Sequence, residues 1–136
     1  MKTLFAMFFA AFTMVAMSAM ASTVSPTLVE GATTVNAEQA KELFEAGVVF
    51  VDVRKDGDWE AGRVPGAYHL ELKSAYNEGG LSGVVAKDAK VVIYCNGDSC
   101  MRSSEACAQA VGWGFKNVYY FRDGFPAWAS AGYPVE

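Results

Sequence analysis

Cysteine is scarce in this chain of 136 residues: it occurs three times, at positions 95, 100 and 107. An odd number of cysteines cannot all pair within one molecule in an oxidising compartment. A small secreted domain that depended on disulfides for its stability would carry more of them. We therefore expect no structural disulfide framework and at least one thiol that is free or that cycles between oxidation states.

Basic residues and histidine are also few. The chain has 11 Lys and Arg residues against 15 Asp and Glu residues, a net charge of −4, and a single histidine, His69. It thus lacks the basic surface that nucleic-acid binding requires. A metal site built from the three cysteines is poorly supported as well, because Cys107 is expected to face the core and His69 lies on another strand.

The first 21 residues carry one charge, Lys2, then an apolar run over residues 4–17 and the small-residue ending Ala19-Met20-Ala21. These are the three parts of a secretory signal peptide. We expect cleavage after Ala21 and a periplasmic or secreted product that starts at Ser22. That product has 10 basic and 15 acidic residues, a net charge of −5.

Two other interpretations of this segment remain open. The run over residues 4–21 has 18 residues, close to the roughly 20 that a membrane-spanning helix needs, so an uncleaved N-terminal anchor is one alternative. Contact with a membrane is expected only in that case. A buried helix of a soluble core is less well supported, because the run is apolar on every side.

The rest of the chain alternates between strand and helix patterns after a polar leader at residues 22–33. The predicted elements are a helix capped by Asn36 and Gln39 and ended by Gly47, strands at 48–53, 67–70, 91–94 and 117–121, and helices at 56–61, 103–111 and 126–132. Residues 73–90 indicate loops around some further helix. Strands apolar on both faces predict an α/β domain with a mainly parallel sheet.

Cys95 follows the strand at 91–94 and precedes a polar loop that leads into a helix. Backbone N–H groups of such a loop, together with the helix N-terminus, favour a thiolate or a persulfide anion. Gly97 allows the positive φ that a curled loop needs, and Arg102 can contact an anionic substrate. The alternative is a buried cysteine followed by an ordinary loop.

Three separated segments resemble the rhodanese family, and the resemblance as a whole extends over roughly residues 34–136. They are Val51-Asp52-Val53-Arg54 through Trp59, Gly62 and Val64-Pro65-Gly66-Ala67; Val91-Val92-Ile93-Tyr94-Cys95 with Gly97, Arg102 and Ser103; and Asn117-Val118 through Asp123-Gly124-Phe125-Pro126-Ala127-Trp128 and Ala131-Gly132-Tyr133-Pro134-Val135. The resemblance implies a three-layer domain whose central parallel sheet has about five strands and is flanked by helices.

The resemblance also implies sulfur transfer without a metal or an organic cofactor. Cys95 would take the outer sulfur of a small sulfur-containing anion such as thiosulfate, or of a persulfide, and pass it to cyanide or to a thiol, including a protein thiol. Backbone amides of the loop would cradle the transferred group. The implied substrate-binding residues are Asn96, Gly97, Asp98, Ser99, Met101, Arg102 and Ser103.

The cysteine loop departs from the family pattern in its length and charge. Six residues separate Cys95 from Arg102, where the usual loop has four, so either the loop is longer or Cys100 takes the place of the arginine. By the same resemblance, wider loops in this superfamily accompany phosphatase and arsenate-reductase activity, although the phosphatase pattern has five intervening residues and a histidine where this chain has Tyr94. Asp98 would repel a thiosulfate dianion unless its side chain faces solvent.

Cys100 leaves three interpretations open. It could resolve a persulfide or sulfenate on Cys95 by forming a disulfide, act as the main nucleophile, or pack as a small side chain. A second class of function follows from the long loop and Asp98: a non-enzymatic rhodanese-like module for binding or thiol redox exchange. Asp52 and Arg54 are expected to tie their strand to neighbouring loops.

Overall fold

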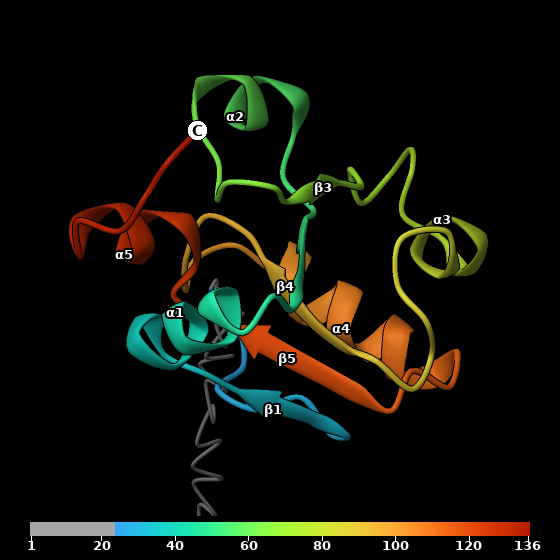
Figure 1. Ribbon diagram of the computed structural model, residues 1–136. Helices are drawn as coiled ribbons and strands as arrows, with labels where there is room; N and C mark the ends of the chain where they lie inside the picture. The colour runs from blue at the N-terminus through green and yellow to red at the C-terminus, as the bar shows by residue number, and fades with distance from the viewer. Residues whose placement is uncertain (1–23) are drawn as a thin grey trace, which may run out of the picture.

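Strands and helices alternate along the chain in the computed structural model, which describes residues 24–136 (Figure 1). The elements are β1 (Ala32–Thr34), α1 (Ala37–Glu45), β2 (Val49–Asp52), α2 (Asp56–Ala61), β3 (Tyr68–His69), α3 (Glu78–Ser82), β4 (Lys90–Tyr94), α4 (Arg102–Gly112), β5 (Asn117–Phe121) and α5 (Gly124–Ser130). The predicted signal peptide, residues 1–21, lies outside the described residues. Within residues 24–136, no helix combines the length and the apolar character needed to cross a membrane.

The five strands form one sheet in the order β1-β5-β4-β2-β3, and every neighbouring pair is parallel. In register, Ile93 of β4 lies between Val51 of β2 and Tyr120 of β5. Parallel neighbours require crossover connections, and the helices of the chain provide them. The prediction of an α/β domain with a parallel sheet of about five strands is confirmed.

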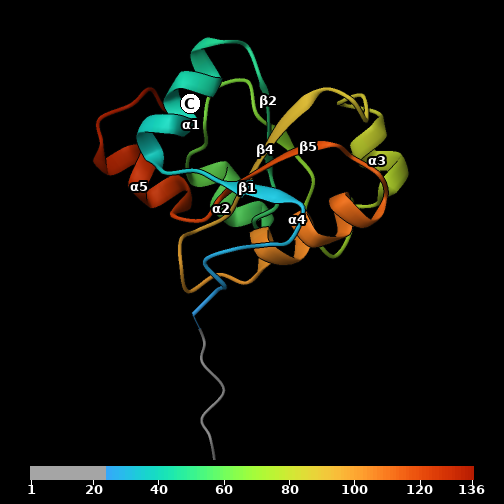
Figure 2. The ribbon, with the colours of Figure 1, turned by 90° about the horizontal axis from the view of Figure 1, so that it is seen from below.

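Alternate side chains of the central strand β4 enter two separate cores. Val91 and Ile93 belong to the core on the side of α3 and α4, whereas Val92 and Tyr94 belong to the core on the side of α1 and α5. Figure 2 shows these helix pairs on opposite sides of the sheet. Burying each such side chain contributes about 1.5–3 kcal/mol, which explains why the strand is apolar on both faces.

Local sequence signals account for the positions of several helices. The Asn36 side chain accepts the Gln39 N–H at 2.8 Å and the Gln39 side chain accepts the Asn36 N–H at 2.9 Å, so the predicted capping box is present. The helix expected somewhere in residues 73–90 is α3, which Asn77 caps. Helix α5 begins at Gly124 rather than near Pro126, because a proline fits the first turn of a helix.

Strand β1 starts at Ala32, inside the segment that we assigned from its polarity to the leader. It pairs with β5 along Thr33 and Tyr119. A strand of 3 residues carries too little hydrophobic alternation to be seen in a sequence, and its position depends on the edge that β5 offers.

Candidate functional site

The cysteine loop starts where β4 ends, at the edge of the sheet where parallel strands present their carboxyl ends. Cys95 is almost fully buried, with 1% of its surface exposed. Its carbonyl oxygen accepts the Phe125 N–H at 2.9 Å. Gly124 has a φ of +64°, and a Cβ there would lie 2.3 Å from that carbonyl oxygen. The loop after β5 therefore closes tightly over the base of the cysteine loop.

Cys95 and Cys100 are joined by a disulfide, with 6.4 Å between their Cα atoms. The Cys100 N–H donates to the Gly97 carbonyl at 3.0 Å, and Gly97 has the positive φ, +116°, that we predicted. Cys100 is partly exposed, unlike Cys95. Because neither sulfur is a thiolate in this form, the loop can act as a nucleophile only after reduction.

The other residues of the predicted substrate-binding loop differ in their exposure. Asp98 and Ser99 are exposed, so the Asp98 carboxylate faces solvent. Met101 exposes 47% of its surface. Ser103 is fully buried in the first turn of α4, and within the described chain its hydroxyl has no hydrogen-bond partner.

Arg102 is the first residue of α4, so the helix starts at the arginine and the longer loop precedes it. Its guanidinium donates from Nη1 to the Val53 carbonyl at 3.1 Å and to the Glu71 carboxylate. Hydrogen bonding from Arg102 lowers the pKa of Glu71 to about 2, with a smaller contribution from the Ser74 hydroxyl. Glu71 was not predicted as a site residue, because no motif in the sequence around it indicates that it pairs with Arg102.

The Glu71–Arg102 ion pair predicts an acid-dependent loss of stability. The pKa of Glu71 is about 2 in the folded chain against 4.5 for a free side chain, so the folded state favours the charged form. This contribution is fully present above pH 4.5 and is lost as the pH falls toward about 2. Glu71→Gln should therefore lower the free energy of unfolding at neutral pH, and the difference from wild type should shrink through this acidic range.

Urea denaturation at a series of pH values measures this difference. Glu78→Gln is the matched control, because Glu78 pairs with Lys87 while both side chains are about half exposed, at 50% and 46%. An exposed pair contributes about 0–1 kcal/mol. If Glu71→Gln and Glu78→Gln show the same pH profile, the ion pair of Arg102 does not stabilise the fold.

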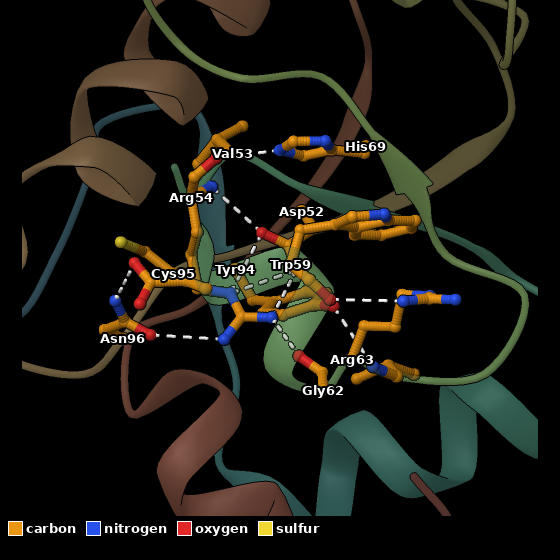
Figure 3. Close-up of polar contacts among 12 residues, drawn as sticks. Asp52, Val53, Arg54, Trp59, Gly62, Arg63, His69, Tyr94, Cys95 and Asn96 are labelled. Carbon is orange, nitrogen blue, oxygen red and sulfur yellow. Dashed lines mark hydrogen bonds and ion pairs between the residues drawn. The ribbon is translucent and has the colours of Figure 1, made fainter. Parts of the chain in front are cut away.

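A buried ion pair lies beneath the cysteine loop (Figure 3). Arg54 donates from Nε to both oxygens of Asp52 at 3.0 Å and from Nη2 to the second oxygen at 2.7 Å. Only 2% of Arg54 and none of Asp52 is exposed. Nη2 of Arg54 also donates to the Gly62 carbonyl at 2.6 Å. The expectation that these two residues tie their strand to neighbouring loops is therefore met for the loop after α2.

The same guanidinium reaches the cysteine loop. Nη1 of Arg54 donates to Oδ1 of Asn96 at 3.3 Å, and Nδ2 of Asn96 donates to Asp58 of α2 at 2.9 Å. The ring of Phe125 lies 4.5 Å from the Arg54 guanidinium carbon. Asn96 is thus held from two sides, and the residue after Cys95 has a fixed orientation. The sequence placed Asn96 in the loop but gave no sign of these partners.

Tyr94, which precedes Cys95, accepts the Val64 N–H on its hydroxyl oxygen at 3.2 Å. Burial raises the pKa of this phenol, and so does the nearby Asp52 carboxylate, so Tyr94 stays protonated. It is a core residue rather than an acid or base. Burial likewise raises the pKa of the Cys107 thiol, which is a free cysteine on the inner face of α4. Cys107 is therefore chemically inert.

Trp128, Trp59, His69 and Arg63 make contacts that hold the fold together. Trp128 is fully buried and donates from Nε1 to the Pro134 carbonyl at 2.7 Å. Trp59 stacks on His69 at 4.8 Å, and the His69 ring contacts the Arg54 carbonyl at 2.9 Å. Arg63 bonds to the Trp59 carbonyl at 3.1 Å. No group of three metal-binding side chains occurs among residues 24–136.

Comparison with known protein families identifies the family to which this fold and its cysteine loop belong. The rhodanese-like domain family matches residues 36–131. The chain belongs to this family. The matched range thus includes strands β2 to β5, the cysteine loop and most of both signature segments around it, whereas residues 24–35, which contain β1, lie outside it.

Related proteins agree with this assignment. The thiosulfate sulfurtransferase GlpE of Pseudomonas savastanoi is 37% identical over 103 residues, covering 73% of this chain and 88% of the relative. The solved Alr3790 protein of Anabaena is 25% identical with a TM-score of 0.65, covering 75% of this chain and 90% of that one. A solved protein from Rhodopseudomonas palustris, described as of unknown function and a possible tyrosine phosphatase, is 31% identical with a TM-score of 0.61, covering 77% and 85%.

Proposed function

We propose that this rhodanese-like domain is a sulfurtransferase that carries sulfur as a persulfide on Cys95. The observation that carries the proposal is the position of Cys95, which stands between the end of β4 and the loop that leads into α4. The similarity to thiosulfate sulfurtransferases supports the same chemistry. The expected export through residues 1–21 makes the periplasm, or the space outside the cell, the proposed place of action.

The reaction requires two displacements at sulfur. The Cys95 thiolate attacks the outer sulfur of the donor, the donor's S–S bond breaks, and the departing group (sulfite from thiosulfate, a thiolate from a persulfide) takes the bonding electrons. An acceptor thiolate then attacks the outer sulfur of the Cys95 persulfide, and Cys95 leaves as a thiolate. Peptide N–H groups at the start of α4 stabilise both anionic forms of Cys95.

The charges around the loop favour a persulfide donor over thiosulfate. The guanidinium of Arg102 is paired with Glu71, so its charge is already balanced. Asp98 adds a carboxylate on the exposed side of the loop. The thiosulfate dianion gains less here than at a site with a free arginine, whereas the persulfide group of a donor brings at most one negative charge to the loop. We therefore expect faster loading of sulfur from a persulfide than from thiosulfate.

Peptide mass spectrometry of the full-length protein tests the proposal. The protein is reduced, freed of reductant and exposed to glutathione persulfide or to thiosulfate, and its peptides are analysed. We expect a mass increase of one sulfur atom on the peptide that contains Cys95, and none in protein left oxidised. Cys107 is the internal control, because it is a buried free thiol. Sulfur found only on Cys100 would contradict the assignment of the nucleophile.

The disulfide favours a second candidate function, a module for thiol redox exchange. Cys95 and Cys100 already form the pair that such a function uses. In that case reduced protein would take up no sulfur from either donor, yet its disulfide would form and break reversibly in a glutathione buffer. The same samples therefore distinguish the two functions.

A further inference from the structure

Residues ahead of the family match form one wall of a groove beside the cysteine loop. The groove has a volume of about 440 Å³ and is lined from the leader by Pro26, Leu28 and Val29 and from α4 and the residue before it by Met101, Glu105 and Ala108. Most of these side chains are apolar. Figure 2 shows the blue leader segment running past the start of α4.

Hydrogen bonds fix the leader against the loop. The Ser25 N–H donates to the Asp98 carbonyl at 2.6 Å, and the Ser25 carbonyl accepts Nη2 of Arg122 at 2.9 Å. The Tyr120 hydroxyl donates to the Pro26 carbonyl at 2.9 Å. Ser25 itself is 2% exposed. The groove is therefore preformed, and its leader wall is attached to the loop that carries the disulfide.

The groove exposes large apolar side chains next to the more accessible sulfur. Leu28 is 74% and Met101 is 47% exposed. Cys100 directly precedes Met101 and is partly exposed, whereas Cys95 is 1% exposed. A thiol that reduces the disulfide thus reaches Cys100 more easily than Cys95. Exposed apolar groups that cluster at a reactive site indicate a surface for a protein partner.

We propose that this groove is the docking surface for a protein that carries a pair of thiols on an apolar face and that reduces the disulfide through Cys100. The proposal deepens the proposed function, on which it rests for the role of Cys95 as the thiol to be released. Among residues 24–136, none that lines the groove is basic, and Glu105 places a carboxylate in its wall. A small anionic thiol such as glutathione therefore gains little there, whereas an apolar protein surface buries Leu28 and Met101.

The exchange balances as two displacements. A thiolate of the partner attacks the Cys100 sulfur, the Cys95–Cys100 bond breaks, and Cys95 leaves with the electron pair as a thiolate. The second thiol of the partner, once deprotonated, then attacks the mixed disulfide and releases Cys100. The partner leaves with a disulfide and this chain with two thiols. Two electrons have therefore passed from the partner, which is oxidised, to this chain, which is reduced.

Rates of reduction test the docking surface, with thioredoxin as the probe dithiol protein and dithiothreitol as the small reductant. In the variant Leu28→Ser/Ala108→Glu, which makes the groove wall polar at two positions outside the cysteine loop, the rate with thioredoxin should fall at least tenfold while the rate with dithiothreitol stays unchanged. Val135→Ser is the matched control, because Val135 is 56% exposed and lines no part of the groove. Thioredoxin with its second cysteine replaced by Ser should be trapped on Cys100.

Four outcomes would overturn the proposal. The first three are an unchanged rate with thioredoxin in the double variant, an equal fall in the rate with dithiothreitol, and trapping of thioredoxin on Cys95. The fourth is a shift of the double variant from dimer to monomer with no change in its reduction rate, which would assign the groove to a second copy of the chain. Reduction is followed by alkylation of free thiols and needs no sulfur donor. A protein that is reduced as expected but takes up no sulfur would therefore contradict the proposed function and leave the docking surface intact.

Discussion

Cys95→Ser should lower sulfur transfer from a persulfide donor by a factor of about 10³ or more, to the rate seen without protein. The reason is that the hydroxyl of serine is far less acidic than a thiol and cannot hold the transferred sulfur as a persulfide. The measurement is the turnover of glutathione persulfide with an excess of acceptor thiol. All proteins are reduced beforehand, because the disulfide masks Cys95.

Cys100→Ser, in contrast, should retain sulfur-transfer activity. This variant cannot form the disulfide, so it should be active at once without prior reduction, whereas oxidised wild type should show a lag that lasts until the acceptor thiol has reduced its disulfide. Cys107→Ala is the control, because this buried thiol forms no disulfide and should be dispensable for turnover. If Cys95→Ser keeps wild-type turnover while Cys100→Ser has none, Cys100 is the nucleophile and the proposed mechanism is wrong.

The elements that the sequence predicted well are those with a strong local signal. The capping box of Asn36 and Gln39 and the apolar run at residues 91–94 each depend on neighbours within a few positions. Gly97 is a similar case, because a glycine in a curled loop after a strand predicts a positive φ. For the same reason the parallel sheet could be inferred, since strands that are buried on both faces need helices on both sides.

The contacts that shape the site could not be predicted, because they join residues far apart in the sequence. Glu71 meets Arg102 across 31 positions, and Asn96 meets Arg54 across 42. Ser25 contacts Asp98 through backbone atoms alone, so no side chain in the leader marks that contact. The pairing of Cys95 with Cys100 was one of several interpretations of Cys100, and spacing alone did not separate them. In each of these cases the fold brings together residues whose partners no local pattern indicates, and the pairing of the two cysteines leaves the role of Cys100 in sulfur transfer a prediction.

Asp52→Ala should lower the free energy of unfolding by about 3–5 kcal/mol, because it leaves the Arg54 charge buried without its partner. Asp52 is fully buried and binds Arg54 through both carboxylate oxygens. The loss is a large part of the roughly 5–15 kcal/mol that stabilises a domain. Urea denaturation monitored by tryptophan fluorescence measures it, since Trp128 lies in the core on the Phe50 side of the sheet.

The double variant Asp52→Ala/Arg54→Met separates the charge from the packing. Methionine removes the uncompensated charge and keeps an apolar side chain against Phe125, which the Arg54 guanidinium covers at 4.5 Å. The double variant should therefore be more stable than Asp52→Ala alone, although it loses the bonds to Gly62 and Asn96. If the double variant is no more stable than Asp52→Ala, the unpaired charge of Arg54 is not the main cost of that substitution. In either case the double variant should load sulfur more slowly than wild type, because the Asn96 side chain then loses Arg54, one of its two partners within residues 24–136, and keeps Asp58.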